Sequence, residues 1–106
     1  MKRNIQVSAS LRFMTAADGG FQRPHSSGVK PHMRIGDVFT SCIVWGQEEE
    51  LFVPGQQYEV GLELPFWDTY KDGVYAGLPL QLNQGSRIVA TGIVEEILEK
   101  TGDSKL

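Results

Sequence analysis

The segment from residue 87 to residue 98, RIVATGIVEEIL, decides the fold class. Its glutamates would suit a helix. However, the β-branched residues Ile88, Val89, Thr91, Ile93 and Val94 lose side-chain freedom in a helix, and Gly92 interrupts them. The segment is therefore predicted to be a long final β-strand, which makes the chain an all-β protein.

Alternation of apolar and polar residues, typical of a strand with one buried face, recurs upstream of this segment. It is clearest in YEVGLEL at 58–64, where Tyr58, Val60, Leu62 and Leu64 share a face. Further strands are predicted at 4–13, around 31–35, at 39–45 and around 78–82, with turns at 46–50, 54–55 and 83–86. About six strands without a convincing amphipathic helix predict a sandwich or a closed barrel. Closure is favoured because it leaves no long strand edge open to aggregation.

Composition sets the broad class of the protein. With 106 residues, the chain is expected to form a single domain over 1–106, with a frayed tail at 101–106. The net charge of -3 gives no support for a general phosphate-binding surface. The single cysteine, Cys42, excludes an internal disulfide and indicates a reducing compartment, so a soluble, unprocessed, cytoplasmic protein is expected. The terminal Ser104-Lys105-Leu106 has the form of a peroxisomal address, and we interpret it as a chance tripeptide.

Several short motifs follow one another in a characteristic order. Asp18-Gly19-Gly20 follows the first strand, and Pro24, Gly28 and Val29-Lys30-Pro31 come after it; Asp37-Val38, Pro54-Gly55 and the run from Gly85 to Val94 come later. Over roughly residues 5–98, this order resembles the third, C-terminal β-barrel domain of elongation factor Tu and related translation GTPases. The resemblance implies a six-stranded antiparallel closed Greek-key β-barrel.

The resemblance also carries functional expectations. The chain has no GxxxxGK[ST] phosphate loop, so GTPase activity is not expected. In the family this barrel helps to hold the acceptor and T-stem backbone of aminoacyl-tRNA and contacts the exchange factor Ts. The RNA-contact candidates implied by resemblance are His32, Thr40 (or Phe39), Gln84 and Gly85. Leu64 stands where some members have a basic residue, and Asn83 replaces an arginine, which removes favourable phosphate contacts.

The segment PFWDTYKDGVY at 65–75 departs from the resembled domain. It is predicted to be a loop that carries Phe66, Trp67, Tyr70 and Tyr75, residue types that anchor protein interfaces or stack on nucleotides. Its charged neighbours include Asp68 and Asp72, so a protein partner is favoured over a nucleic acid. The alternative is that two or more of these rings cap one end of the barrel.

Residues 18–34 contain both histidines and two adjacent serines. His25 and His32 lack a metal-binding spacing, Ser26 and Ser27 suit turn hydrogen bonds, and Cys42 lies in an apolar strand. No catalytic residue, metal or cofactor is predicted. The favoured hypothesis is a non-enzymatic module that binds protein through 65–75. An RNA- or tRNA-contacting module is the second hypothesis, and a small hydrolase using the 18–34 loop is the third.

Overall fold

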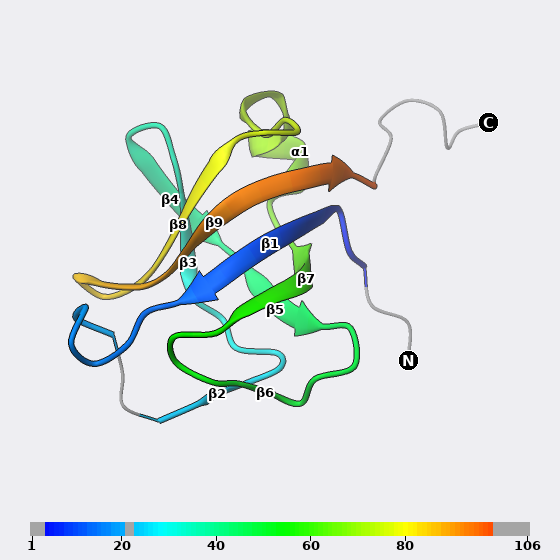
Figure 1. The fold of residues 1–106 in the computed structure, drawn as a ribbon. Helices are drawn as coiled ribbons and strands as arrows, with labels where there is room; N and C mark the ends of the chain where they lie inside the picture. The colour runs from blue at the N-terminus through cyan, green and yellow to red at the C-terminus, as the bar shows by residue number, and fades with distance from the viewer. Residues whose placement is uncertain (1–3, 21–22, 99–106) are drawn as a thin grey trace.

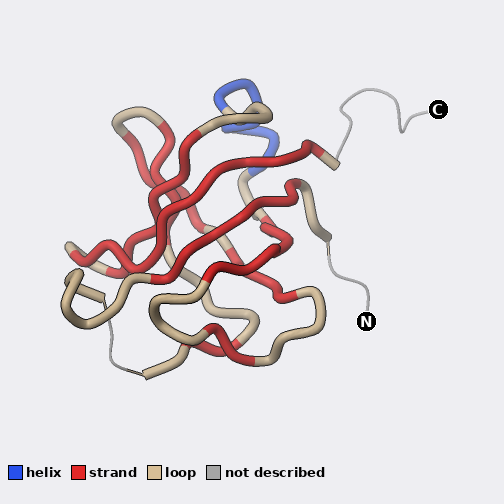
Figure 2. Tube along the Cα trace, in the orientation of Figure 1, coloured by secondary structure: helices blue, strands red, loops and turns tan. Residues whose placement is uncertain are grey.

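The computed structural model describes residues 4–20 and 23–98, so the predicted frayed tail at 101–106 and the terminal tripeptide lie outside the described residues. The strands are β1 (Val7–Phe13), β2 (His25–Ser26), β3 (His32–Ile35), β4 (Val38–Ser41), β5 (Ile43–Gly46), β6 (Leu51–Phe52), β7 (Gln57–Glu63), β8 (Pro79–Gln84) and β9 (Arg87–Ile97). Between β7 and β8 lie the helix α1 (Trp67–Tyr70) and the 3-10 turn η1 (Lys71–Gly73). Figure 1 and Figure 2 show this arrangement.

Most of these strands belong to one antiparallel sheet with the order β4-β3-β8-β9-β1-β7-β5. The sheet is strongly curled into a half-barrel, and β2 pairs with β6 separately (Figure 1). The predicted all-β class is therefore confirmed, and the predicted final strand at 87–98 is observed as β9, which ends at Ile97. No helix among the described residues is long and apolar enough to cross a membrane.

The core lies on the concave side of the curled sheet and follows the predicted alternation. In β1 and β7 every second residue is buried or half-buried, whereas β9 buries the adjacent Val89 and Ala90. The fully buried side chains include Val7, Ala9, Leu11, Phe13, Met33, Val60, Leu62 and Leu82. The rings of Phe13 and Phe52 stack with their centroids 4.8 Å apart at one end of this core. Alternate side chains of a strand point to opposite faces, which explains why the pattern at 4–13 and 58–64 predicted the buried set.

The predicted strand at 39–45 is divided at Cys42 into β4 and β5. β4 pairs with β3, whereas β5 pairs with β7, so the two ends of the sheet order are joined by a single residue. The Cys42 N–H donates to the Pro31 carbonyl oxygen at 3.2 Å, and the Val44 N–H donates to that of Val29 at 2.9 Å. These bonds continue the β3–β4 pairing onto β5. A closed six-stranded barrel remains a prediction.

The burial of Cys42 leads to a chemical prediction. Desolvation raises the pKa of this thiol to about 12, so the reactive thiolate is scarce in the folded protein at neutral pH. We expect the native protein to react with a thiol reagent such as DTNB at least about a hundredfold more slowly than the urea-unfolded chain. The measurement is the rate of absorbance change in each state. Equal rates would contradict the burial of Cys42.

The segment 65–75 is not the simple loop that was predicted. Residues 67–70 form α1, and 71–73 form η1. The Trp67 N–H donates to the Leu64 carbonyl oxygen at 3.0 Å, which begins the turn directly after β7. A helix of four residues is too short to display a 3.6-residue hydrophobic period, so the sequence pattern gave no sign of it.

Candidate functional site

A surface groove brings together residues from both sets of candidates predicted from the sequence. This aromatic groove has a volume of 430 Å³ and is lined by His32, Phe39, Thr40, Ser41, Phe66, Thr69 and Tyr70. Its walls come from β3, from β4 and from the chain around α1. His32 and Thr40 were RNA-contact candidates, whereas Phe66 and Tyr70 were protein-binding candidates. The fold therefore places four of the eight candidates in one groove.

The β3–β4 hairpin forms one wall of the aromatic groove. Its loop consists of Gly36 and Asp37, because Ile35 pairs with Val38. Gly36 has a φ of 60°, a backbone angle that glycine adopts without strain and that suits the first position of a two-residue hairpin loop. The short loop fixes the register, and Phe39 therefore projects from β4 with 47% of its surface exposed.

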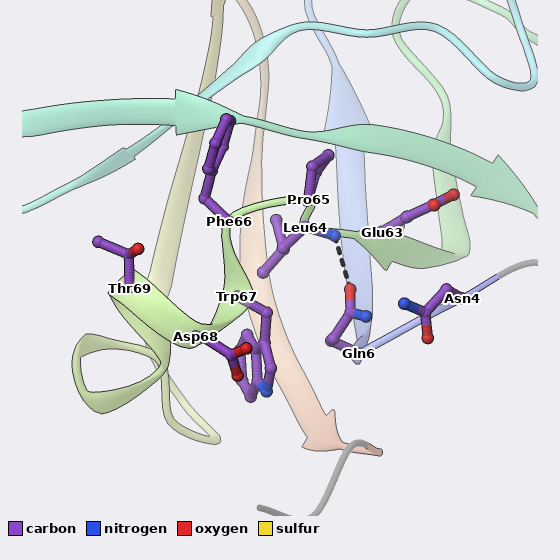
Figure 3. Close-up of a pocket in the computed structure, with 9 residues that line it drawn as sticks. All are labelled: Asn4, Gln6, Glu63, Leu64, Pro65, Phe66, Trp67, Asp68 and Thr69. Atoms are coloured by element: carbon purple, nitrogen blue, oxygen red, sulfur yellow. Dashed lines mark hydrogen bonds between the residues drawn. The ribbon is translucent and has the colours of Figure 1, made fainter.

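The α1 segment forms the other wall. Figure 3 shows Phe66 and Trp67 pointing in opposite directions, with the Phe66 ring directed at the strand that ends in Ser41. Phe66 is 56% exposed, whereas Trp67 is only 7% exposed and packs in the core. The buried indole holds α1 against the sheet. The turn of the helix then presents Thr69 and Tyr70 to the groove.

The four predicted protein-binding residues thus separate into distinct groups. Phe66 and the half-buried Tyr70 line the aromatic groove, and Tyr75 is 56% exposed but is not among the lining residues. The expectation that Trp67 offers a surface anchor is wrong, because its side chain belongs to the core. Its indole N–H has no hydrogen-bond partner among the described residues. The alternative interpretation required two or more of these rings to cap the core, and Trp67 is the only buried one of the four.

The four RNA-contact candidates also differ in position. His32 is exposed and pairs with Asn83 across β3 and β8, directly before Gln84 and Gly85. Gly85 has a φ of 64° in the tight β8–β9 turn, so the turn itself accounts for a glycine there. Thr40 is only 4% exposed, and this burial disfavours direct contact with RNA. Its hydroxyl lacks a partner among the described residues.

The serines and histidines of the opening loop lie in different surroundings. The Ser27 hydroxyl oxygen accepts the Gly46 N–H at 2.9 Å and lines a hollow formed with residues 45–50. The His25 ring lies 5.6 Å from that of Phe13, and burial lowers the pKa of His25. His32 lines the aromatic groove instead. Within 4–20 and 23–98, no three residues of the His, Cys, Asp and Glu types gather as a possible metal site.

A second hollow shares Phe66 and Thr69 with the aromatic groove, but its exposed surface is mostly polar. It has a volume of 270 Å³ and is lined by Asn4, Gln6, Glu63 and the residues from Leu64 to Thr69 (Figure 3). The buried Gln6 side-chain oxygen accepts the Leu64 N–H at 2.7 Å, and Glu63 accepts the Trp45 indole N–H at 2.9 Å. Gln6 and Glu63 thus accept hydrogen bonds from the Leu64 backbone and the Trp45 indole where β7 ends. This is a structural role.

Sequence reasoning did not assign Phe39 to a protein-binding surface, although a signal was present. In the strand 39–45, the buried face consists of Thr40, Cys42 and Val44. Strict alternation then turns Phe39 outward. Alternation predicts only that the ring is exposed, because a single exposed apolar residue is ordinary. Its meeting with Phe66 in the groove, which makes it part of a larger apolar surface, required the fold.

No protein-family model matches this chain.

Proposed function

We propose that this protein is a non-enzymatic binding module that binds a protein partner through the aromatic groove, without GTPase activity. The observation that carries the proposal is the pair of large exposed rings, Phe39 and Phe66, beside the half-buried Tyr70. Exposed aromatic side chains that gather at a groove are typical of interface anchors, since they bury much apolar area on binding. A cytoplasmic location belongs to the proposal, supported by the single buried thiol of Cys42.

The proposal includes a closed six-stranded barrel like the third domain of elongation factor Tu. Its support is a circuit of pairings in which β3 pairs with both β4 and β8. From β8 the pairing runs through β9, β1 and β7 to β5. The Val29–Val44 bridge then connects β5 to the residues that lead into β3. If β4 and β5 are counted as one bent strand, this circuit has six strands, the number in that barrel. The proposed relationship to elongation factor Tu rests on the ordered sequence motifs.

Two exposed aromatic residues of the same segment test the groove. Phe66→Ser should reduce capture of a specific partner from cell extract by at least about tenfold, because it removes an anchor of the groove. Tyr75→Ser, which removes an equally exposed ring outside the lining residues, should leave capture within about twofold. The readout is quantitative mass spectrometry of proteins retained by each immobilised variant. Thermal melting of each variant controls for folding. Equal losses in both variants would remove the groove as the binding site.

RNA binding is the second candidate function. The register between β3 and β8 favours it, because it brings three of the RNA-contact candidates close together. Pairing of His32 with Asn83 places an exposed imidazole beside the strand end that carries Gln84 and Gly85. Binding of this kind would weaken steeply with added salt and would depend on Lys30 and Arg34. The same immobilised protein, titrated with tRNA at low salt, decides the matter. Absence of detectable binding there would exclude this function.

A further inference from the structure

Strand β4 presents an unpaired edge at the end of the sheet. Among the described residues it pairs with β3 alone, in the register Arg34 with Phe39 and His32 with Ser41. Ile35 and Val38 flank the two-residue loop and form a hydrogen-bonded pair, so the bonds to β3 fall on every second residue of β4. The backbone N–H and C=O groups of Phe39 and Ser41 therefore point away from β3. No backbone hydrogen bond outside the sheet engages either residue within the part of the chain that the structure describes.

The sequence of β4 contains no residue that blocks this edge. Natural edge strands are commonly blocked by a charged side chain, a proline or a bulge. β4 reads Val-Phe-Thr-Ser and has none of these, and its pairing with β3 is regular. Both Val38 and Phe39 are exposed. Phe39 and Ser41, whose backbone groups are unpaired, also line the aromatic groove.

We propose that an extended peptide segment of the partner adds to the sheet as a strand along β4, with alternate side chains in the aromatic groove. This inference rests on the proposed function and specifies its ligand. The backbone groups of Phe39 and Ser41 would supply the main-chain hydrogen bonds, and the rings of Phe66 and Tyr70 would contact one apolar peptide side chain. Strand addition of this kind obtains affinity from the main chain and specificity from pockets for alternate side chains.

Charge indicates the residues that flank this apolar side chain. The groove lining contains no lysine, arginine or carboxylate. The charged residues next to it in the chain are of both signs: Arg34 pairs with Phe39, Asp37 directly precedes β4, and Lys71 follows Tyr70. Lys71 lies 3.9 Å from Asp68, which lines the second hollow instead. A peptide with uncharged residues on either side of an aromatic or β-branched residue complements this surface.

Selection from a random octapeptide display library on the full chain provides defined probes. We expect enrichment of peptides that alternate apolar residues with uncharged polar residues. In a synthetic copy of the best peptide, methylation of the alternate amide nitrogens that face β4 should weaken binding by at least about tenfold, because each methyl group removes a donor and blocks close approach. Methylation of the intervening nitrogens is the matched control. Fluorescence anisotropy measures each affinity, and amide hydrogen exchange at Phe39 and Ser41 should slow on binding.

Variants of the protein separate this inference from the proposed function. Ser41→Pro removes the outward N–H at a position where an edge strand tolerates proline, and Ser41→Ala keeps it. Binding lost in Ser41→Pro and kept in Ser41→Ala, with melting temperatures preserved, supports strand addition. Peptides that require Phe66 yet tolerate every N-methylation would overturn strand addition while keeping the groove. Peptides that ignore Phe66 as well, or a selection without enrichment, would overturn both. A concentration-dependent dimer abolished by Ser41→Pro would mean that a second copy occupies the edge, which also overturns the peptide proposal.

Discussion

Replacement of Trp67 by alanine is expected to lower the free energy of unfolding by about 3 to 5 kcal/mol, as is usual when a buried large aromatic side chain is truncated. Trp67 is the only buried residue of α1, so its loss leaves a cavity and also releases the helix from the sheet. The adjacent Phe66→Ala should change stability by less than about 1 kcal/mol, because that ring is mostly exposed. Urea denaturation followed by far-UV circular dichroism measures both.

A third variant examines the unpartnered indole N–H of Trp67. Trp67→Phe keeps an aromatic ring in the core and removes a buried donor, and an unsatisfied buried donor costs about 1 to 3 kcal/mol. Its destabilisation should therefore be clearly smaller than that of Trp67→Ala. If Phe66→Ala unfolded the protein and Trp67→Ala did not, the assignment of faces around α1 would be reversed and the aromatic groove would lose its principal ring.

The core strands could be predicted from the sequence because their signal is local. In β1 and β7, apolar residues recur at every second position, and this period predicts which side chains are buried. Val7 and Leu11 in β1, and Val60 and Leu62 in β7, are examples. The same reasoning assigned residues 87–98 to a strand, since β-branching outweighs the glutamates. These patterns depend on neighbours within a few residues, and no knowledge of the partner strands is needed.

The candidate site could be predicted only in part, because it depends on which face each residue occupies. Phe66 and Trp67 are adjacent and of the same chemical class, yet one is exposed and the other is buried. That choice follows from the phase of a four-residue helix, which composition does not reveal. His32 and Phe66 line the same groove because the β3–β4 hairpin and α1 pack together. That contact joins parts of the chain that are distant in sequence. The change of partner strand at Cys42 is likewise a property of the assembled sheet.

Gly92→Ala is expected to lower the free energy of unfolding by about 1 to 3 kcal/mol, the range for overpacking that displaces backbone. Gly92 lies in the middle of β9, where it pairs with Leu11 of β1 and Leu80 of β8. A Cβ atom at this position would overlap the carbonyl oxygen of Ser10 and lie 2.9 Å from the Leu11 side chain. The backbone of β1 cannot yield without loss of its pairing with β9. The urea midpoint of the variant measures the effect.

Gly61 in β7 provides the matched control, because it is also a mid-strand glycine without a positive φ. There a new Cβ would lie 2.9 Å from the end of the Ile5 side chain, which precedes β1 and can rotate away. Alanine is also favoured over glycine within a strand by about 0.5 to 1 kcal/mol, so Gly61→Ala should be nearly neutral. Similar small effects in both variants would show that β1 and β9 are not held at the close spacing described. A large effect confined to Gly92 would mean that this glycine, which argues against a helix in the sequence, is required by strand packing in the fold.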